Sequence, residues 1–258
     1  MEDKNIYEYT LMLADSSLIM GQRLSEWTGH GPILELDIAI TNIALDEIGQ
    51  ARLLYQFAAE LKNKQEPGSK ATEDTIAFLR DAWDFKNLQI SELPNGDWGQ
   101  SVLKIFFLAH WQRQMYGKLI YSPIKNLSDV AEKALKEVTY HVRWSSDWVR
   151  RLGDGTEESR GRMQKALEYL WPYTQEFFEP EGYEWDGIFE NAGEDFFENM
   201  KAGWNKEVSL VLTEASLTLP ESHTYMRKGG KKGLHTEHLG HLLAEMQFLQ
   251  RAYPGCEW

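Results

Sequence analysis

The chain has 258 residues with 40 acidic and 27 basic side chains, which gives a formal net charge of −13. This length supports a core that needs no disulfide or metal to hold it together, and the acidic balance argues against a nucleic-acid groove or an anionic membrane surface as partner. The single cysteine, Cys256, excludes an intramolecular disulfide, and neither a basic leader nor a long apolar run is seen, so we expect a cytoplasmic protein.

Apolar residues recur with the helical period along most of the chain, and strand-like alternation is nearly absent. Thr72 could cap the third helix and Ser128 or Asn126 the fifth, because their side-chain oxygens accept amide protons of a first turn. Helices are expected at about 5–27, 33–63, 72–91, 98–121, 127–151, 157–178, 194–213 and 236–251.

This pattern predicts an all-α protein built on a four-helix bundle with additional C-terminal helices. We expect a single domain over residues 1–258. Its core helices would lie at about 5–63 and 98–151, and a helical extension would follow at 155–258.

Two of the predicted helices carry polar residues inside an apolar stripe. Glu47 and Gln50 interrupt the stripe of the second helix, and His141 interrupts that of the fifth, one turn after Val138. Ferritin-like carboxylate proteins place Glu-x-x-His on two core helices and a single Glu on each of the other two. Here the two pairs read Glu47-x-x-Gln50 and Val138-x-x-His141, so half of each pair is absent.

The remaining core helices offer no carboxylate at the same level. Ser16 stands where the first helix would contribute a glutamate, and His110 and Gln114 are the inward candidates on the fourth. Valine cannot bind a metal, and serine or glutamine replaces an anionic bridge poorly. We therefore predict no metal and no catalytic residue in this chain, with vestigial site positions at Ser16, Glu47, Gln50, Val138 and His141.

A buried carboxylate must be protonated, paired or hydrogen-bonded. For Glu47 we expect His141 and Gln50 as the partners. Weak residual metal affinity at Glu47 and His141 is the alternative that this interpretation leaves open.

A glycine-rich stretch near the C-terminus carries Lys231 and Lys232 just before a predicted helix. Such a loop could contact a partner's carboxylate or another anion, or it could be a basic flexible connector. Further along, His238, His241 and Glu245 could share a helix face and suit zinc, although the histidines stand three apart rather than four as in the helical zinc proteases.

Aromatic residues are concentrated between positions 177 and 204. We expect them to serve core and interface packing, with a ligand pocket as the alternative. The residues concerned are Phe177, Phe178, Tyr183, Trp185, Phe189, Phe196, Phe197 and Trp204.

Several strings of the sequence resemble the PaaC family of bacterial phenylacetyl-CoA epoxidases. The resemblance spans almost the whole chain, and its C-terminal part is the most specific. The strings are Gln22–His30, Asn42–Arg52, Pro94–Gly96, Lys136–His141, Gly229–Gly240 and Leu243–Gln247.

The resemblance implies a ferritin-like bundle that pairs with a related PaaA-type subunit, which holds the di-iron centre and binds phenylacetyl-CoA. A small PaaB-type subunit would bridge the pairs, and an NADPH-dependent reductase would supply electrons. In the catalytic relative a histidine stands at the position of Gln50 and a glutamate at that of Val138. Glu47 departs from the family pattern, because apolar residues can occupy its position in PaaC-type proteins.

The resemblance thus implies a non-catalytic structural subunit with no cofactor of its own. Two alternatives come from other classes of protein. One is a self-contained ferritin-like metalloprotein or di-iron oxidase that uses Glu47 and His141. The other is a helical protein with a different binding role, such as a homodimer.

Overall fold

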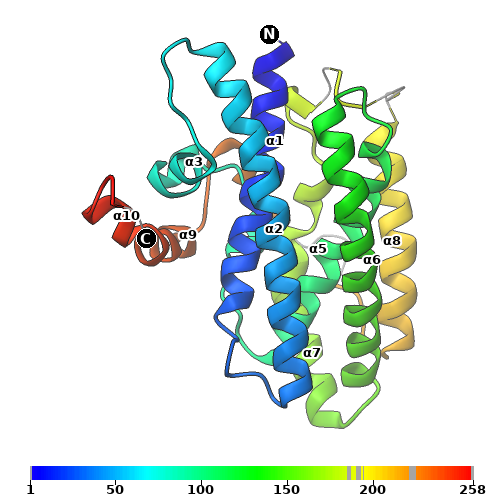
Figure 1. The fold of residues 1–258 in the computed structure, drawn as a ribbon. Coiled ribbons are helices and arrows are strands. Elements are labelled where there is room, and N and C mark those ends of the chain that lie inside the picture. Colours follow the sequence, from blue (N-terminus) through cyan, green and yellow to red (C-terminus); the bar gives the residue numbers. More distant parts are fainter. Residues whose placement is uncertain (1, 185–186, 190–192, 194, 221–224, 257–258) are drawn as a thin grey trace.

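The computed structural model describes residues 2–184, 187–189, 193, 195–220 and 225–256. Over these residues the regular structure is helical throughout, without a strand, which confirms the all-α prediction. Four long helices form the bundle: α1 (Glu2–Ser25), α2 (Leu34–Gln65), α5 (Trp98–Leu119) and α6 (Lys125–Gly153). Helix α1 packs along α2, α5 packs along α6, and α2 also contacts α6 (Figure 1).

Additional helices flank the bundle on two sides. Helices α7 (Glu157–Leu170) and α8 (Phe196–Glu214) pack against α5 and α6. On the side of α1 and α2, α9 (Glu237–Met246) and α10 (Phe248–Ala252) lie beside α3 (Glu73–Leu79), away from α6 (Figure 1). None of the helices that the structure describes has the length and apolar character that crossing a bilayer needs.

The prediction of a single helix at 72–91 is wrong. This region forms α3, a 3₁₀ turn at Ala82–Asp84 and the short α4 (Gln89–Glu92). The buried carboxylate of Asp15 accepts hydrogen bonds from the Arg80 side chain and, at 2.8 Å, from the backbone N–H of Lys86. These bonds turn the connecting backbone toward α1, so tertiary contacts override the local helical pattern.

The helix expected at 157–178 is shorter than predicted. Helix α7 ends at Leu170, and 3₁₀ turns at Trp171–Tyr173 and Gln175–Phe178 follow it. Pro172 lies in the first of these turns, and its ring cannot continue a helical hydrogen-bond ladder.

The two cap predictions have opposite outcomes. The Thr72 side chain accepts the N–H of Thr75 and caps α3, as predicted. The caps proposed for the fifth helix are wrong, because α6 begins at Lys125 and its N-cap, Ile124, makes no side-chain cap. Ser128 therefore lies inside the first turn and donates to the carbonyl of Lys125.

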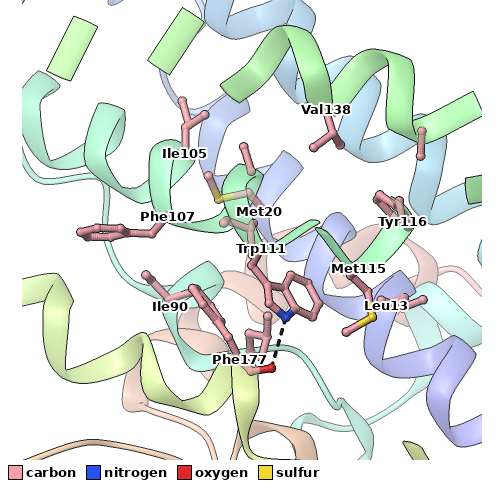
Figure 2. Close-up of a cluster of buried hydrophobic side chains, with 14 of the residues drawn as sticks. Leu13, Met20, Ile90, Ile105, Phe107, Trp111, Met115, Tyr116, Val138 and Phe177 are labelled. Atoms are coloured by element: carbon pink, nitrogen blue, oxygen red, sulfur yellow. Dashed lines mark hydrogen bonds between the residues drawn. The ribbon is translucent and has the colours of Figure 1, made fainter. Parts of the chain in front are cut away.

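Much of the aromatic stretch packs into the core. Trp111 of α5 donates from Nε1 to the carbonyl of Phe177 over 3.1 Å, and the two rings stack. Figure 2 draws this hydrogen bond as a dashed line. Trp204 of α8 donates in the same way to the carbonyl of Phe107. Core packing is confirmed for the buried members Phe177, Phe178, Phe189, Phe197 and Trp204, whereas Trp185 lies outside the described residues.

Candidate functional site at the bundle centre

The five vestigial positions are all buried, but the structure does not bring all of them together. The Ser16 hydroxyl donates to the carbonyl of Met12 and accepts the N–H of Leu88, so it serves the connection between α3 and α4. The next residue, Ser17, has its hydroxyl near Glu47 instead, where it lowers the pKa of that carboxyl group. On α1, therefore, Ser17 rather than Ser16 contributes to the bundle centre.

Glu47 lies between the core helices with its carboxylate buried. Its Oε2 accepts a hydrogen bond from Gln112 Nε2 of α5 at 3.0 Å. Burial raises the pKa of Glu47, and the nearby His141, the bond from Gln112 and the hydroxyl of Ser17 offset this only in part. The bundle centre therefore favours the neutral form of this carboxyl group more than water does.

His141 makes its hydrogen bond to the neighbour of Glu47. Its Nε2 lies 2.9 Å from Asp46 Oδ2, and because a carboxylate only accepts, Nε2 carries the proton. Its Nδ1 has no hydrogen-bond partner among the described residues and lies 4.0 Å from Glu47 Oε1. The predicted partnership of Glu47 and His141 is thus an approach without a direct hydrogen bond.

Gln50 does not pair with Glu47, so that part of the prediction is wrong. Tyr116 of α5 donates its hydroxyl to Gln50 Oε1 at 3.2 Å, and Gln50 Nε2 donates to Glu137 Oε2 at 3.0 Å. Burial, followed by the Glu47 carboxylate, raises the pKa of Tyr116, so its phenol keeps the proton that it donates. Gln50 thereby links α5 to α6 across the bundle.

The inward residues of α5 also differ from those expected. Gln112 and Tyr116, one turn apart, point to the centre. His110 instead places Nδ1 2.8 Å from the carbonyl of Phe106, and burial lowers its pKa to about 4. The amide of Gln114 hydrogen-bonds the α8 backbone at Met200.

The donors at the centre do not fit a di-iron centre of the carboxylate type, which needs four carboxylates and two imidazoles. Val138 has no donor atom, and Gln112 presents an amide N–H to the buried carboxylate of Glu47. Across the part of the chain that the structure describes, no cluster of three or more His, Cys, Asp or Glu side chains could hold a metal. His238, His241 and Glu245 therefore do not form such a cluster.

The two lysines of the glycine-rich loop have different surroundings. Lys231 is buried, with Nζ 3.1 Å from Glu184 Oε2, while Glu176 accepts the N–H groups of the two glycines just before it. Its ammonium group is therefore paired inside the chain and has almost no exposed surface. Lys232 is exposed with Nζ 3.2 Å from Glu181, and its contact with a partner or an anion stays a prediction.

Comparison with known proteins agrees with the architecture. Residues 1–258 match the family PaaA_PaaC, described as Phenylacetic acid catabolic protein. The chain is also 43% identical over 250 residues to the C component of 1,2-phenylacetyl-CoA epoxidase from Escherichia coli (strain K12), with 97% of this chain and 98% of that protein covered. The resemblance to PaaC-type proteins is thus confirmed, and the chain belongs to the phenylacetic acid catabolic protein family.

Proposed function

We propose that this chain is a non-catalytic structural subunit of a phenylacetyl-CoA epoxidase complex that acts in aerobic phenylacetate catabolism in the cytoplasm. Its partners would be a PaaA-type subunit that holds the di-iron centre and binds the substrate, and a small PaaB-type bridging subunit. An NADPH-dependent reductase would act on the assembled complex. The long, well-covered similarity to a protein named as an epoxidase subunit supports this assignment.

The non-catalytic role is supported chiefly by the hydrogen bonds that the polar side chains form with one another at the bundle centre. Gln112 bonds Glu47, Tyr116 bonds Gln50, and Gln50 bonds Glu137. These side chains tie α2, α5 and α6 to one another. A ligand set for two iron ions would instead need carboxylate oxygens that are free to converge on the metals.

In this role the chain acts mechanically, because it presents a rigid helical surface that holds the catalytic subunit in its working arrangement. Turnover should need both subunits. The test is epoxidation of phenylacetyl-CoA by the PaaA-type and PaaB-type subunits with reductase, measured with and without this chain. We expect little turnover without it and none from this chain and reductase alone; full activity of the PaaA-type subunit by itself would refute the structural role.

A self-contained metalloprotein is the second candidate, and one observation favours it. His141 Nδ1 has no hydrogen-bond partner among the described residues and faces Glu47 Oε1. The discriminating measurement is the iron, zinc and manganese content of the chain alone after anaerobic incubation with ferrous iron. We expect far less than one metal per chain; about two irons per chain, lost in Glu47→Ala and His141→Ala, would establish the metalloprotein instead.

The role of Lys232 has its own test. Lys232→Ala should weaken assembly or turnover if the exposed ammonium contacts a partner or the acyl-CoA. Unchanged assembly and turnover would remove Lys232 from the proposal without affecting the rest.

A further inference from the structure

Helix α2 exposes a line of large apolar side chains. Leu34, Ile38 and Leu45 are 69%, 51% and 60% exposed. Their spacing of four and seven residues places them on one side of the helix, opposite the residues that enter the core. Scattered exposed leucines are ordinary, whereas a line of them along one helix indicates a surface that another molecule covers.

Helix α6 continues this surface. Hydrogen bonds from His141 to Asp46, from Gln50 to Glu137 and from Asn126 to Glu60 fix an antiparallel register between α2 and α6. The two helices lie side by side in Figure 1.

In that register Leu45 lies level with Tyr140 and Trp144, and Ile38 lies level with Trp148. Tyr140 is exposed, and both tryptophans are half-buried. Tyrosine and tryptophan dominate the binding energy of many interfaces. We call this surface the α2/α6 face, formed by Leu34, Ile38, Leu45, Tyr140, Trp144 and Trp148.

Gly49 continues the α2 line one turn after Leu45. A glycine inside a helix costs about 1 kcal/mol relative to alanine, and a Cβ atom added at Gly49 would meet nothing within 4 Å. No contact among the described residues requires position 49 to lack a side chain. A backbone from another molecule that approaches α2 closely would require it.

The edge of the face is basic, although the whole chain has a net charge of −13. Lys136, Arg143 and Arg151 of α6 are exposed, and none forms an ion pair with a carboxylate in the part of the chain that the structure describes. The guanidinium groups of Arg143 and Arg151 instead lie over the rings of Tyr140 and Trp148. Three cations are therefore available to an acidic partner.

The charges also decide against a second copy of this chain. From Leu34, where the face begins, to Gln56 the exposed residues of α2 include one acid, Glu35, and one base, Arg52. The exposed Asp147 of α6 already forms an ion pair within its own helix, so two copies that met through this face would bring their unpaired cations mainly against cations or against an apolar line. Like charges in such an interface reduce its affinity.

We propose that the α2/α6 face docks a different helical subunit, which presents an apolar ridge bordered by carboxylates. Under the function proposed above, on which this inference rests, that subunit is the PaaA-type one. The line from Leu34 to Gly49 spans about 22 Å at 1.5 Å per residue. A compact interface of about 800 Å² per partner is roughly 30 Å across, so this line would extend over most of it.

The apolar part of the face is tested by Leu45→Glu. The matched control is Leu210→Glu on α8, where the leucine is 59% exposed and lies outside the face. Both changes affect exposed positions, so both variants should fold, which circular dichroism and size exclusion check. In titrations of purified PaaA-type subunit we expect binding at least about 30-fold weaker for Leu45→Glu and within about 2-fold of wild type for the control.

The basic edge is tested by Lys136→Glu, with the exposed Lys118 of α5 as control. Charge at the rim of an interface acts mainly on the association rate. Lys136→Glu should slow association by roughly 10-fold at low salt and flatten its dependence on ionic strength. Lys118→Glu should do neither.

The possible outcomes distinguish an error in the α2/α6 face from an error in the proposed function. If wild type binds and Leu45→Glu binds equally well, the face is wrong and the structural role stands. Equal weakening by Leu45→Glu and Leu210→Glu also overturns the face, because the effect is then not local. A wild-type homodimer that Leu45→Glu dissociates overturns the choice of occupant, and absence of any wild-type complex overturns the proposed function together with the inference.

Discussion

Replacing Glu47 with glutamine keeps the shape of the side chain and removes a charge that the bundle centre solvates poorly. The amide oxygen of the variant can still accept the N–H of Gln112, which now lies 3.0 Å from Glu47 Oε2. The new amide N–H group would face His141 Nδ1, which has no partner among the described residues. We therefore expect Glu47→Gln to be more stable than wild type at neutral and alkaline pH.

The pH dependence follows from the direction of the pKa shift. Burial raises the folded-state pKa of Glu47 above its ordinary value of 4.5, so the folded state holds this proton to higher pH than the unfolded state does. Wild-type stability attributable to Glu47 therefore falls as pH rises from about 4.5 through the folded-state pKa, and the loss is complete above it. An incompletely satisfied buried polar group costs about 1–3 kcal/mol, so a gain of about 1–2 kcal/mol at pH 8 is expected for the variant, which buries no charge.

The assay is thermal unfolding of wild type and Glu47→Gln between pH 4 and pH 8. For a chain of this length the gain corresponds to roughly 2–8 °C in Tm at pH 8, and it should shrink toward zero near pH 4. The exposed Glu132 of α6 provides the control, since Glu132→Gln should stay within about 0.5 kcal/mol of wild type at every pH. A Glu47→Gln variant that is less stable than wild type at pH 8 would refute the reasoning, because the ionised carboxylate would then have a stabilising counter-charge.

Two further comparisons use neighbouring or equivalent positions as controls. Lys231→Met leaves the buried Glu184 without its ammonium partner and should destabilise the fold by about 3–5 kcal/mol, whereas Lys232→Met should change stability by less than about 0.5 kcal/mol; equal effects in urea unfolding would contradict the buried pair. Gly153→Ala would place its Cβ 2.3 Å from a backbone carbonyl oxygen just after α8 and should lower Tm strongly. Gly161→Ala of α7, where a Cβ would meet nothing within 4 Å, should stabilise the fold by about 0.5–1 kcal/mol. A Gly153→Ala variant that is also stabilised would show that α6, which contains Gly153, can separate from α8 without cost.

The bundle could be predicted from the sequence because α2 and α6 bury one side and expose the other. In α6 the apolar stripe and the charged face are clearly separated, and the stripe correctly placed Val138 and His141 in the core. The same reasoning placed Glu47 and Gln50 of α2 inside. Helical period is thus sufficient to identify buried polar residues on helices that have one solvent face.

Helix α5 shows where the period loses its information. It packs against α6, α7 and α8, and 16 of its 22 residues are buried. Since nearly every side of α5 is covered, burial cannot indicate which side faces the bundle centre. His110 and Gln114 were therefore equivalent to Gln112 and Tyr116 at the level of sequence, and only the structure selects the second pair.

The connections depend on carboxylates whose partners are distant in sequence. Asp15 forms an ion pair with Arg80, Glu92 lies 2.9 Å from His235 Nδ1, and Glu184 forms an ion pair with Lys231. No periodic signal marks these acids as buried, because each becomes acceptable inside the protein only through a partner that the fold brings to it.

These buried acids also indicate what the ionic interactions do in this protein. A buried ion pair adds little net stability, since desolvation offsets most of the attraction, but breaking one leaves an isolated charge and is costly. Here Glu92 and Glu184 fix the segment that leads into α9 against the bundle, while Glu47, at the centre, has no cation in direct hydrogen-bond contact among the described residues. The buried pairs of Glu92 and Glu184 therefore position an added segment against the bundle, which fits the proposed role of a subunit that works through its surface.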